Sequence, residues 1–238
     1  LEFRRVLFRS MMSYWVLFIG IAVASWLVQM NLQNKFKKYS KIPTGNGMTG
    51  RDVALKMLHD NGIYDVQVTH TPGQLTDHYN PANKTVNLSE GVYESNSIMA
   101  AAVAAHECGH AVQHARMYAP LKMRSALVPV VNFSSSIMTW VLLGGILLFN
   151  TFPQLLWIGI ILFATTTLFS FITLPVEINA SKRALVWLSS SGITNSYNHT
   201  QAEDALRSAA YTYVVAALGS LATLIYYIMI AIDRKSVV

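Results

Sequence analysis

The strongest chemical signal in this chain is the run His106-Glu107-Cys108-Gly109-His110. On a helix, two histidines four residues apart lie one turn apart on the same face, so both imidazoles can reach one metal ion. A glutamate directly after the first histidine can contact a metal-bound water rather than the metal itself. The spacing therefore predicts a catalytic zinc site in which His106 and His110 are metal ligands and Glu107 is the general base.

The single cysteine, Cys108, lies two residues from each histidine. This offset turns its side chain away from the histidine face of a helix, so we interpret it as a small packing residue rather than a metal ligand. Because the chain has no second cysteine, an intramolecular disulfide framework is excluded.

The composition is typical of a membrane protein rather than of an ordinary soluble domain. The chain of 238 residues is 53% hydrophobic and 13% charged, whereas soluble domains carry about 25% charged residues. Four apolar stretches, each long enough to cross a bilayer, explain the difference: residues 14–30, 128–149, 155–174 and 211–232. The short turn at 150–154 makes a helical hairpin of the second and third stretches, and the lipid bilayer is an expected partner.

The two ends of the chain differ in character from the rest. Residues 1–10 resemble a vector-derived leader before a natural start at Met11 or Met12, and residues 233–238 resemble a partly non-native tail. Without residues 1–10 and 234–238 the net charge of +6 falls to about +2, so nucleic acid is not an expected partner. The first apolar stretch could be a signal peptide, since Ala22-Val23-Ala24 resembles a cleavage site. Apolar residues continue beyond it, so we favour a retained anchor.

Basic residues near the apolar stretches predict one orientation. They follow the first stretch, precede the second and follow the third, whereas the turn at 150–154 has none: Lys35, Lys37, Lys38, Lys41, Lys122, Arg124, Lys182 and Arg183. By the positive-inside rule, all three groups lie in the cytoplasm. The expected organisation is an anchor at 12–31, a cytoplasmic catalytic region at 32–127, a transmembrane hairpin at 128–175, a cytoplasmic segment at 176–210 and a last span at 211–232.

The region between the first two spans predicts a small α+β unit. Thr49 can cap a helix that runs to about His59, before Asn61-Gly62. Strand patterns occur at 64–69, 74–79 and 85–88, with a turn-rich linker at 80–83, and a helix over 97–117 carries the zinc motif. The expected fold class is an α-helical membrane protein with about four transmembrane helices and a small, zincin-like α+β catalytic region in the cytoplasm.

A catalytic zinc ion takes three protein ligands and one water, so a third ligand must lie outside the motif. Glu177 is our candidate, because acidic side chains are costly beside membrane spans and this one directly follows the third span. Two crossings separate it from His110, so the chain returns to the side of the histidines. The structural alternative pairs Glu177 with Lys182 or Arg183. His114 shares the histidine face, but a straight helix spreads three ligands too far apart, so we assign it to the surroundings of the site.

Short motifs throughout residues 12–232 are those of a known family: 36–40, 47–50, 61–66, 75–79, 106–114, 124–129 and 174–177. By these motifs the chain resembles the bacterial YugP-type neutral zinc metallopeptidases, which are membrane proteins. The resemblance implies a multi-pass protein of the bacterial cell membrane that carries zinc and cleaves peptide bonds.

The layout resembles, more distantly, that of HtpX-like membrane proteases, in which the third-ligand glutamate also follows a transmembrane hairpin. Those enzymes have an aspartate four residues after this glutamate, whereas Ser181 stands at that position here. The carboxylate that would orient a zinc ligand is therefore absent there. Asn179 and Asp77 are the candidates to replace it.

The predicted activity is peptide hydrolysis at one zinc ion per chain, with Glu107 moving the proton and the substrate being a membrane or membrane-proximal protein. A further donor would stabilise the oxyanion. By residue type His78, Tyr79 and Tyr213 are candidates, although core packing or an interface hydroxyl is the favoured interpretation of each. A strand at 85–88 is expected to pair with an extended substrate.

Two other functions compete with this prediction. An intramembrane-type zinc protease would explain the apolar residues 98–105, but polar residues follow soon after the motif. A catalytically inactive membrane scaffold would keep the motif as packing and bind no zinc. An oligomer is also compatible with the sequence, because Gly144-Gly145 and the small residues 134–136 can pack helices within one chain or between chains.

Overall fold

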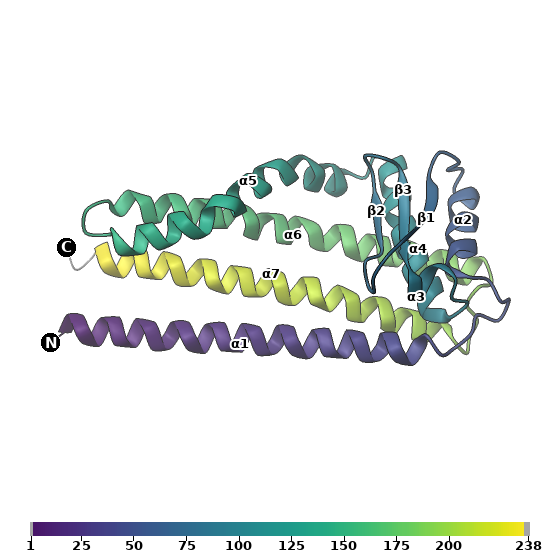
Figure 1. Cartoon of the computed structure of the whole chain (residues 1–238), viewed down its shortest axis with the longest axis horizontal. Coiled ribbons are helices and arrows are strands. Elements are labelled where there is room, and N and C mark those ends of the chain that lie inside the picture. Colours follow the sequence, from purple (N-terminus) through teal and green to yellow (C-terminus); the bar gives the residue numbers. More distant parts are fainter. Residues whose placement is uncertain (1, 236–238) are drawn as a thin grey trace. The chain divides into compact units, whose positions relative to one another are not determined.

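The computed structural model describes the backbone of residues 2–235 and the side chains of residues 15–233 (Figure 1). Leu1 and residues 236–238, which belong to the two expected non-native ends, lie outside the described residues. The described elements are α1 (Glu2–Tyr39), α2 (Gly50–Asp60), β1 (Gln67–Thr71), β2 (His78–Asn80), β3 (Thr85–Ser89), α3 (Glu90–Tyr93), α4 (Ile98–Ala115), α5 (Ala119–Leu147), α6 (Pro153–Ser190) and α7 (His199–Lys235).

The chain divides into two compact units. The membrane unit contains the residues up to Leu27, Met123–Thr173 and the residues from Thr212 onward. The metal unit contains Val28–Lys122 and Leu174–Tyr211. Helices α1, α5, α6 and α7 each contribute residues to both units.

Four described helices are long and apolar enough to cross a membrane: Trp15–Tyr39, Ala119–Leu147, Pro153–Ser190 and His199–Asp233. Together with a small sheet of mixed strand direction, they confirm the expected fold class of a mostly helical protein with four long apolar helices. Each helix begins before the apolar stretch that predicted it. Helix α6 also extends through Pro175 to Ser190, so Glu177 lies within the same helix as the third apolar stretch.

The α5–α6 hairpin of the membrane unit depends on one close approach. A Cβ atom at Gly145 would lie 2.6 Å from the backbone N and Cα of Leu156, so only glycine allows this spacing. Leu156, Leu142 and Ile160 form a buried cluster here with Ala231 of α7. A hydrogen bond of 2.7 Å between the hydroxyls of Thr167 and Ser220 joins α6 to α7.

The core of the metal unit forms around α4. Ser97 caps this helix by accepting a hydrogen bond from the backbone N–H of Ala100. The small side chains of 100–105 let α4 lie deep among α2, the sheet and the end of α6, where Leu58, Leu88 and Leu188 are fully buried. Burial in this core accounts for the apolar character of residues 98–105, which the intramembrane alternative had explained by lipid.

Helix α2 begins as the sequence predicted. Thr49 accepts a hydrogen bond from the backbone N–H of Asp52, whose carboxylate accepts one from the backbone N–H of Thr49. This capping box satisfies two backbone donors that the first helical turn leaves unpaired. The helix ends at Asp60, and Asn61 caps it.

The strand patterns in the sequence did not predict the order of the strands in the sheet. Its order is β1-β3-β2, with β1 parallel and β2 antiparallel to β3. The prediction that the strand at 85–88 pairs with substrate is therefore wrong, because neighbours occupy both edges of β3. The strand boundaries also shift, since Gly73 and Leu75 take positive φ angles that end the extended conformation between β1 and β2.

Candidate metal centre

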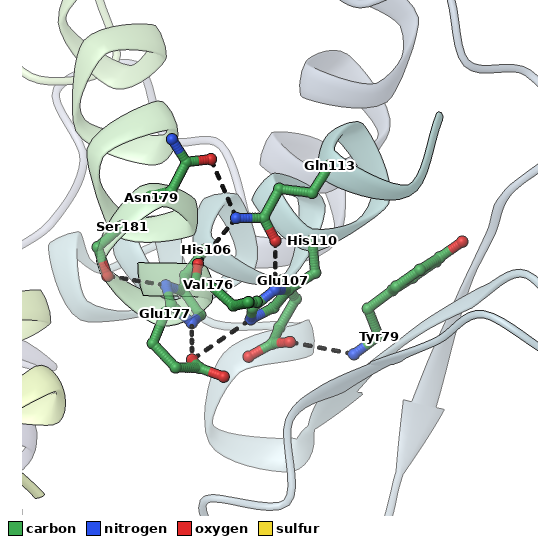
Figure 2. A network of polar contacts seen from close by, with 9 residues as sticks. All are labelled: Tyr79, His106, Glu107, His110, Gln113, Val176, Glu177, Asn179 and Ser181. Carbon is green, nitrogen blue, oxygen red and sulfur yellow. Dashed lines mark hydrogen bonds and ion pairs between the residues drawn. The ribbon is translucent and has the colours of Figure 1, made fainter. Parts of the chain in front are cut away.

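Helices α4 and α6 bring His106, His110 and Glu177 to one point (Figure 2). One ligand atom from each residue lies within 4.8 Å of the others. Oε2 of Glu177 is 3.2 Å from Nε2 of His106 and 3.4 Å from Nε2 of His110. Two ligands of a tetrahedral zinc ion, each bound at about 2.0–2.1 Å, lie about 3.3 Å apart. The donor set and its spacing therefore fit a zinc site.

The three side chains differ in their access to solvent. The side chains of Glu177 and His110 retain 3% and 10% of their exposure, and that of His106 retains 13%. A carboxylate this deeply buried is unfavourable unless it is paired or bound to a metal. The two imidazoles supply that pairing here.

Gly109 makes the crossing of the two helices close enough for Glu177 to reach the histidines. A Cβ atom at Gly109 would lie 2.7 Å from the carbonyl oxygen and 3.1 Å from the Cα atom of Ala180 on α6. Ala180 itself is fully buried. Because Glu177 precedes Ala180 by about one helical turn, this contact sets its distance from the histidines.

Each histidine has a hydrogen-bonding partner at its other ring nitrogen. The Oγ atom of Ser181 lies 3.1 Å from Nδ1 of His106. The side chain of Gln113 lies 3.0 Å from Nδ1 of His110 through its Oε1 atom, and Gln113 in turn binds Asn179. Ring partners of this kind orient imidazole ligands toward a metal. Ser181 thus contacts a candidate ligand through its hydroxyl.

Gln113 was missed by the sequence reasoning. The available signal was its position three residues after His110, on the same face of the helix. Asn179 lies next to Gln113 rather than next to a histidine. Asp77, the other expected substitute, accepts hydrogen bonds from the backbone N–H and the hydroxyl of Ser89.

Glu107 is held by the main chain of β2. The backbone N–H of Tyr79 donates a hydrogen bond of 3.0 Å to Oε2 of Glu107, whose exposure is 9%. The ring of Tyr79 points away from the three ligands (Figure 2), and its hydroxyl lies 2.8 Å from Nδ1 of His114. Tyr79 therefore contacts Glu107 through its backbone N–H, and its hydroxyl contacts His114.

The other two residues proposed as oxyanion donors are His78 and Tyr213. Nδ1 of the exposed His78 is 2.8 Å from the carbonyl oxygen of Thr76. Tyr213 belongs to the membrane unit. Of the residues that the sequence suggested around the metal ligands, the structure brings Asn179 and the backbone of Tyr79 to the metal group.

Burial and charge shift the pKa values of His110 and Cys108. Burial alone would lower the pKa of His110, but the hydrogen bond to Glu177 and the charges of Glu107 and Glu177 hold the pKa above its usual value. Because histidine binds a metal only in its deprotonated form, metal affinity falls with acidification. Burial raises the pKa of Cys108, whose Sγ atom lies 3.5 Å from the carbonyl oxygen of Ala54. Cys108 is a buried packing residue, as predicted.

Comparison with known proteins agrees with this chemistry. Residues 14–232 match the model of a family described as "putative neutral zinc metallopeptidase". The chain is 43% identical over 224 residues to the "putative membrane protease YugP" of Bacillus subtilis (strain 168). The matched region covers 92% of this chain and 99% of that protein. The resemblance inferred from the short motifs is confirmed. No solved structure matches the chain significantly.

Proposed function

The chain belongs to the neutral zinc metallopeptidase family, and we propose that it is a membrane-bound peptidase that uses one zinc ion, held by His106, His110 and Glu177, and Glu107 as its general base. The observation that carries the proposal is the convergence of the three donor atoms at 3.2 and 3.4 Å, the spacing of ligands on tetrahedral zinc. A bound zinc ion would supply Lewis acidity that activates water and polarises the scissile carbonyl.

The protein's own groups have separate tasks in this mechanism. Glu107 accepts a proton from the attacking water and passes it to the leaving amine. The backbone N–H of Tyr79 keeps one carboxylate oxygen of Glu107 in place at 3.0 Å. Because this donor is part of β2 rather than of a flexible side chain, the carboxylate is held without loss of side-chain entropy on the donor's side.

The test compares zinc content and cleavage of denatured casein by the purified chain in detergent. Glu107→Gln should keep about one zinc ion per chain and lose cleavage by at least about a hundredfold, whereas Glu177→Ala should lose zinc. Glu94→Gln, a change at an exposed glutamate of the same unit, should alter neither. Undiminished cleavage by Glu107→Gln would exclude this mechanism, and full zinc content in Glu177→Ala would exclude Glu177 as a ligand.

We further propose that the site faces the cytoplasm of a bacterial cell and acts on membrane or membrane-proximal proteins. The support is the pattern of basic residues beside three of the four apolar helices, together with the uncharged turn between α5 and α6. Asn150→Cys should react with a membrane-impermeant maleimide in intact cells, and Lys41→Cys only after permeabilisation. Both positions are exposed, and the buried Cys108 gives little background. The reverse labelling pattern would invert the topology.

A further inference from the structure

Gln113 is the most deeply buried polar side chain near the metal group, with no exposed surface. Burying an amide is unfavourable unless its donors and acceptor are all hydrogen-bonded. Gln113 meets this condition with three contacts: Oε1 lies 3.0 Å from Nδ1 of His110, and Nε2 lies 2.8 Å from the carbonyl oxygen of Val176 and 3.0 Å from Oδ1 of Asn179. Asn179 then accepts a hydrogen bond of 2.7 Å from Nε of Arg183. Figure 2 shows Gln113 between His110 and Asn179.

The donors and acceptors of this chain of contacts can be ordered in only one way. The guanidinium of Arg183 can only donate, so the atom of Asn179 that faces it is the amide oxygen. The carbonyl of Val176 can only accept, so the atom of Gln113 that faces it is the amide nitrogen. The oxygen of Gln113 is therefore turned toward His110 and accepts a proton from Nδ1. A neutral His110 then carries its lone pair on Nε2, the atom that faces Glu177.

We propose that Gln113 is a positioning residue for the metal site, and that Asn179 and Arg183 hold its amide in the orientation that presents Nε2 of His110 to the metal. The inference deepens the proposed function and rests on it, since it concerns a ligand of the same site. Gln113 also binds the carbonyl of Val176, the residue before Glu177. One side chain thus aligns a ligand on α4 with the backbone that carries the ligand on α6.

His106 has no such preset polarity. Its Nδ1 atom faces the hydroxyl of Ser181, which can donate or accept. The two histidines therefore differ. The surroundings of His110 specify its tautomer, whereas the hydroxyl beside His106 can pair with either tautomer. A carboxylate beside His106 could only accept a hydrogen bond and would remove this freedom, whereas Gln113 specifies the tautomer of His110.

The zinc affinity of the full chain in detergent, measured by competition with a chelator, tests the proposal. Gln113→Met has nearly the same volume but no hydrogen-bonding groups, and it should bind zinc about 10–100-fold more weakly. Asn179→Leu should weaken zinc binding in the same direction but less. Asn179→Asp keeps an oxygen acceptor for both Gln113 and Arg183, so it should stay within about threefold of the wild-type affinity.

A second measurement separates positioning from packing. In zinc-loaded protein labelled with ¹⁵N-histidine, the Nδ1–H proton of His110 should give a resonance protected from exchange, identified by its loss in His110→Asn. Gln113→Met and Asn179→Leu should lose this protection, and Asn179→Asp should keep it. The melting temperature of the zinc-free variants gives the packing contribution separately. If Gln113→Met does not fold, Asn179→Leu and Asn179→Asp still decide, because Asn179 is only half-buried.

The outcomes for this proposal and for the proposed function can be told apart. Wild-type zinc affinity in Gln113→Met or Asn179→Leu, in a protein that binds zinc and cleaves casein, would overturn the positioning role and leave the peptidase intact. Equal weakening by Asn179→Asp and Asn179→Leu would overturn it as well, because the acceptor would then not matter. A wild-type protein that binds no zinc would refute both.

Discussion

Replacing Gly109 by alanine adds one methyl group at the closest approach of α4 to α6. That methyl carbon would lie 2.7 Å from the carbonyl oxygen of Ala180, a distance that folded proteins do not accept. The carbonyl oxygen and the Cα atom of Ala180 are both backbone atoms inside a helix, so neither can rotate away as a side chain would. To reach 3.0–3.4 Å, the helices must separate locally by about 0.3–0.7 Å.

This displacement matters more for the metal than for folding. Overpacking costs about 1–3 kcal/mol, whereas alanine favours a helix interior over glycine by about 1 kcal/mol, so the two effects on stability partly cancel. Metal–ligand distances, however, tolerate only about 0.2 Å. Glu177 lies one turn from Ala180 and would be carried away from His106 and His110 by more than this margin. We expect zinc affinity to fall at least about tenfold, the lower end of the effect of disturbing groups that support a ligand.

The measurement is zinc affinity by chelator competition, with the melting temperature of the zinc-free protein recorded beside it. Gly20→Ala is the matched control, since Gly20 lies in helix α1 with nothing within 4 Å of its missing Cβ atom. This variant should leave zinc affinity unchanged. Wild-type zinc affinity in Gly109→Ala would refute the reasoning, because it would mean that the spacing of α4 and α6 does not control the ligands.

Three further predictions follow from burial and charge. The only cysteine, Cys108, is fully buried with a raised pKa, so a thiol reagent should label the native protein only after unfolding; rapid native labelling would contradict its packing role. Burial raises the pKa of Asp77, so its contribution to stability is full below the unfolded pKa of about 3.8 and is lost as pH rises through the folded pKa. The melting temperature of Asp77→Asn relative to that of the wild type should therefore rise between pH 4 and 7. The opposite trend would mean that the carboxylate is stabilised. Removal of zinc should lower the melting temperature reversibly, because binding at a thousandfold excess over Kd adds about 4 kcal/mol; Glu177→Ala should show no such response, and an equal response would place the zinc elsewhere.

Local patterns in the sequence predicted the parts of this protein whose physics is local. The spacing of His106 and His110 brings their side chains to one face only if the segment is helical, and α4 is that helix. The capping box at Thr49 and Asp52 formed where the sequence placed it, because its contacts span only three residues. Long apolar stretches predicted the four long helices for the same reason, although their ends were not predicted.

The order of the strands could not be obtained in this way. The three strand patterns gave no information on which strand lies in the middle. In the structure that strand is β3, which pairs with β1 on one side and with β2 on the other. Such pairing depends on segments far apart in the sequence. The backbone contact from Tyr79 to Glu107 was equally hidden, because every residue other than proline has an N–H and nothing in the sequence marks the one that will be used.

The sequence by itself determined the residue types of the site, the helix that presents two of them and the presence of four long apolar helices. Glu177 was inferred from chain topology, and the tertiary structure decided its distance from the histidines through the contact of Gly109 with Ala180. It also decided which nitrogen of each histidine has a partner and which residue supplies it. These properties arise where α4 crosses α6, and a crossing depends on the shape of two packed surfaces rather than on the order of residues along either helix.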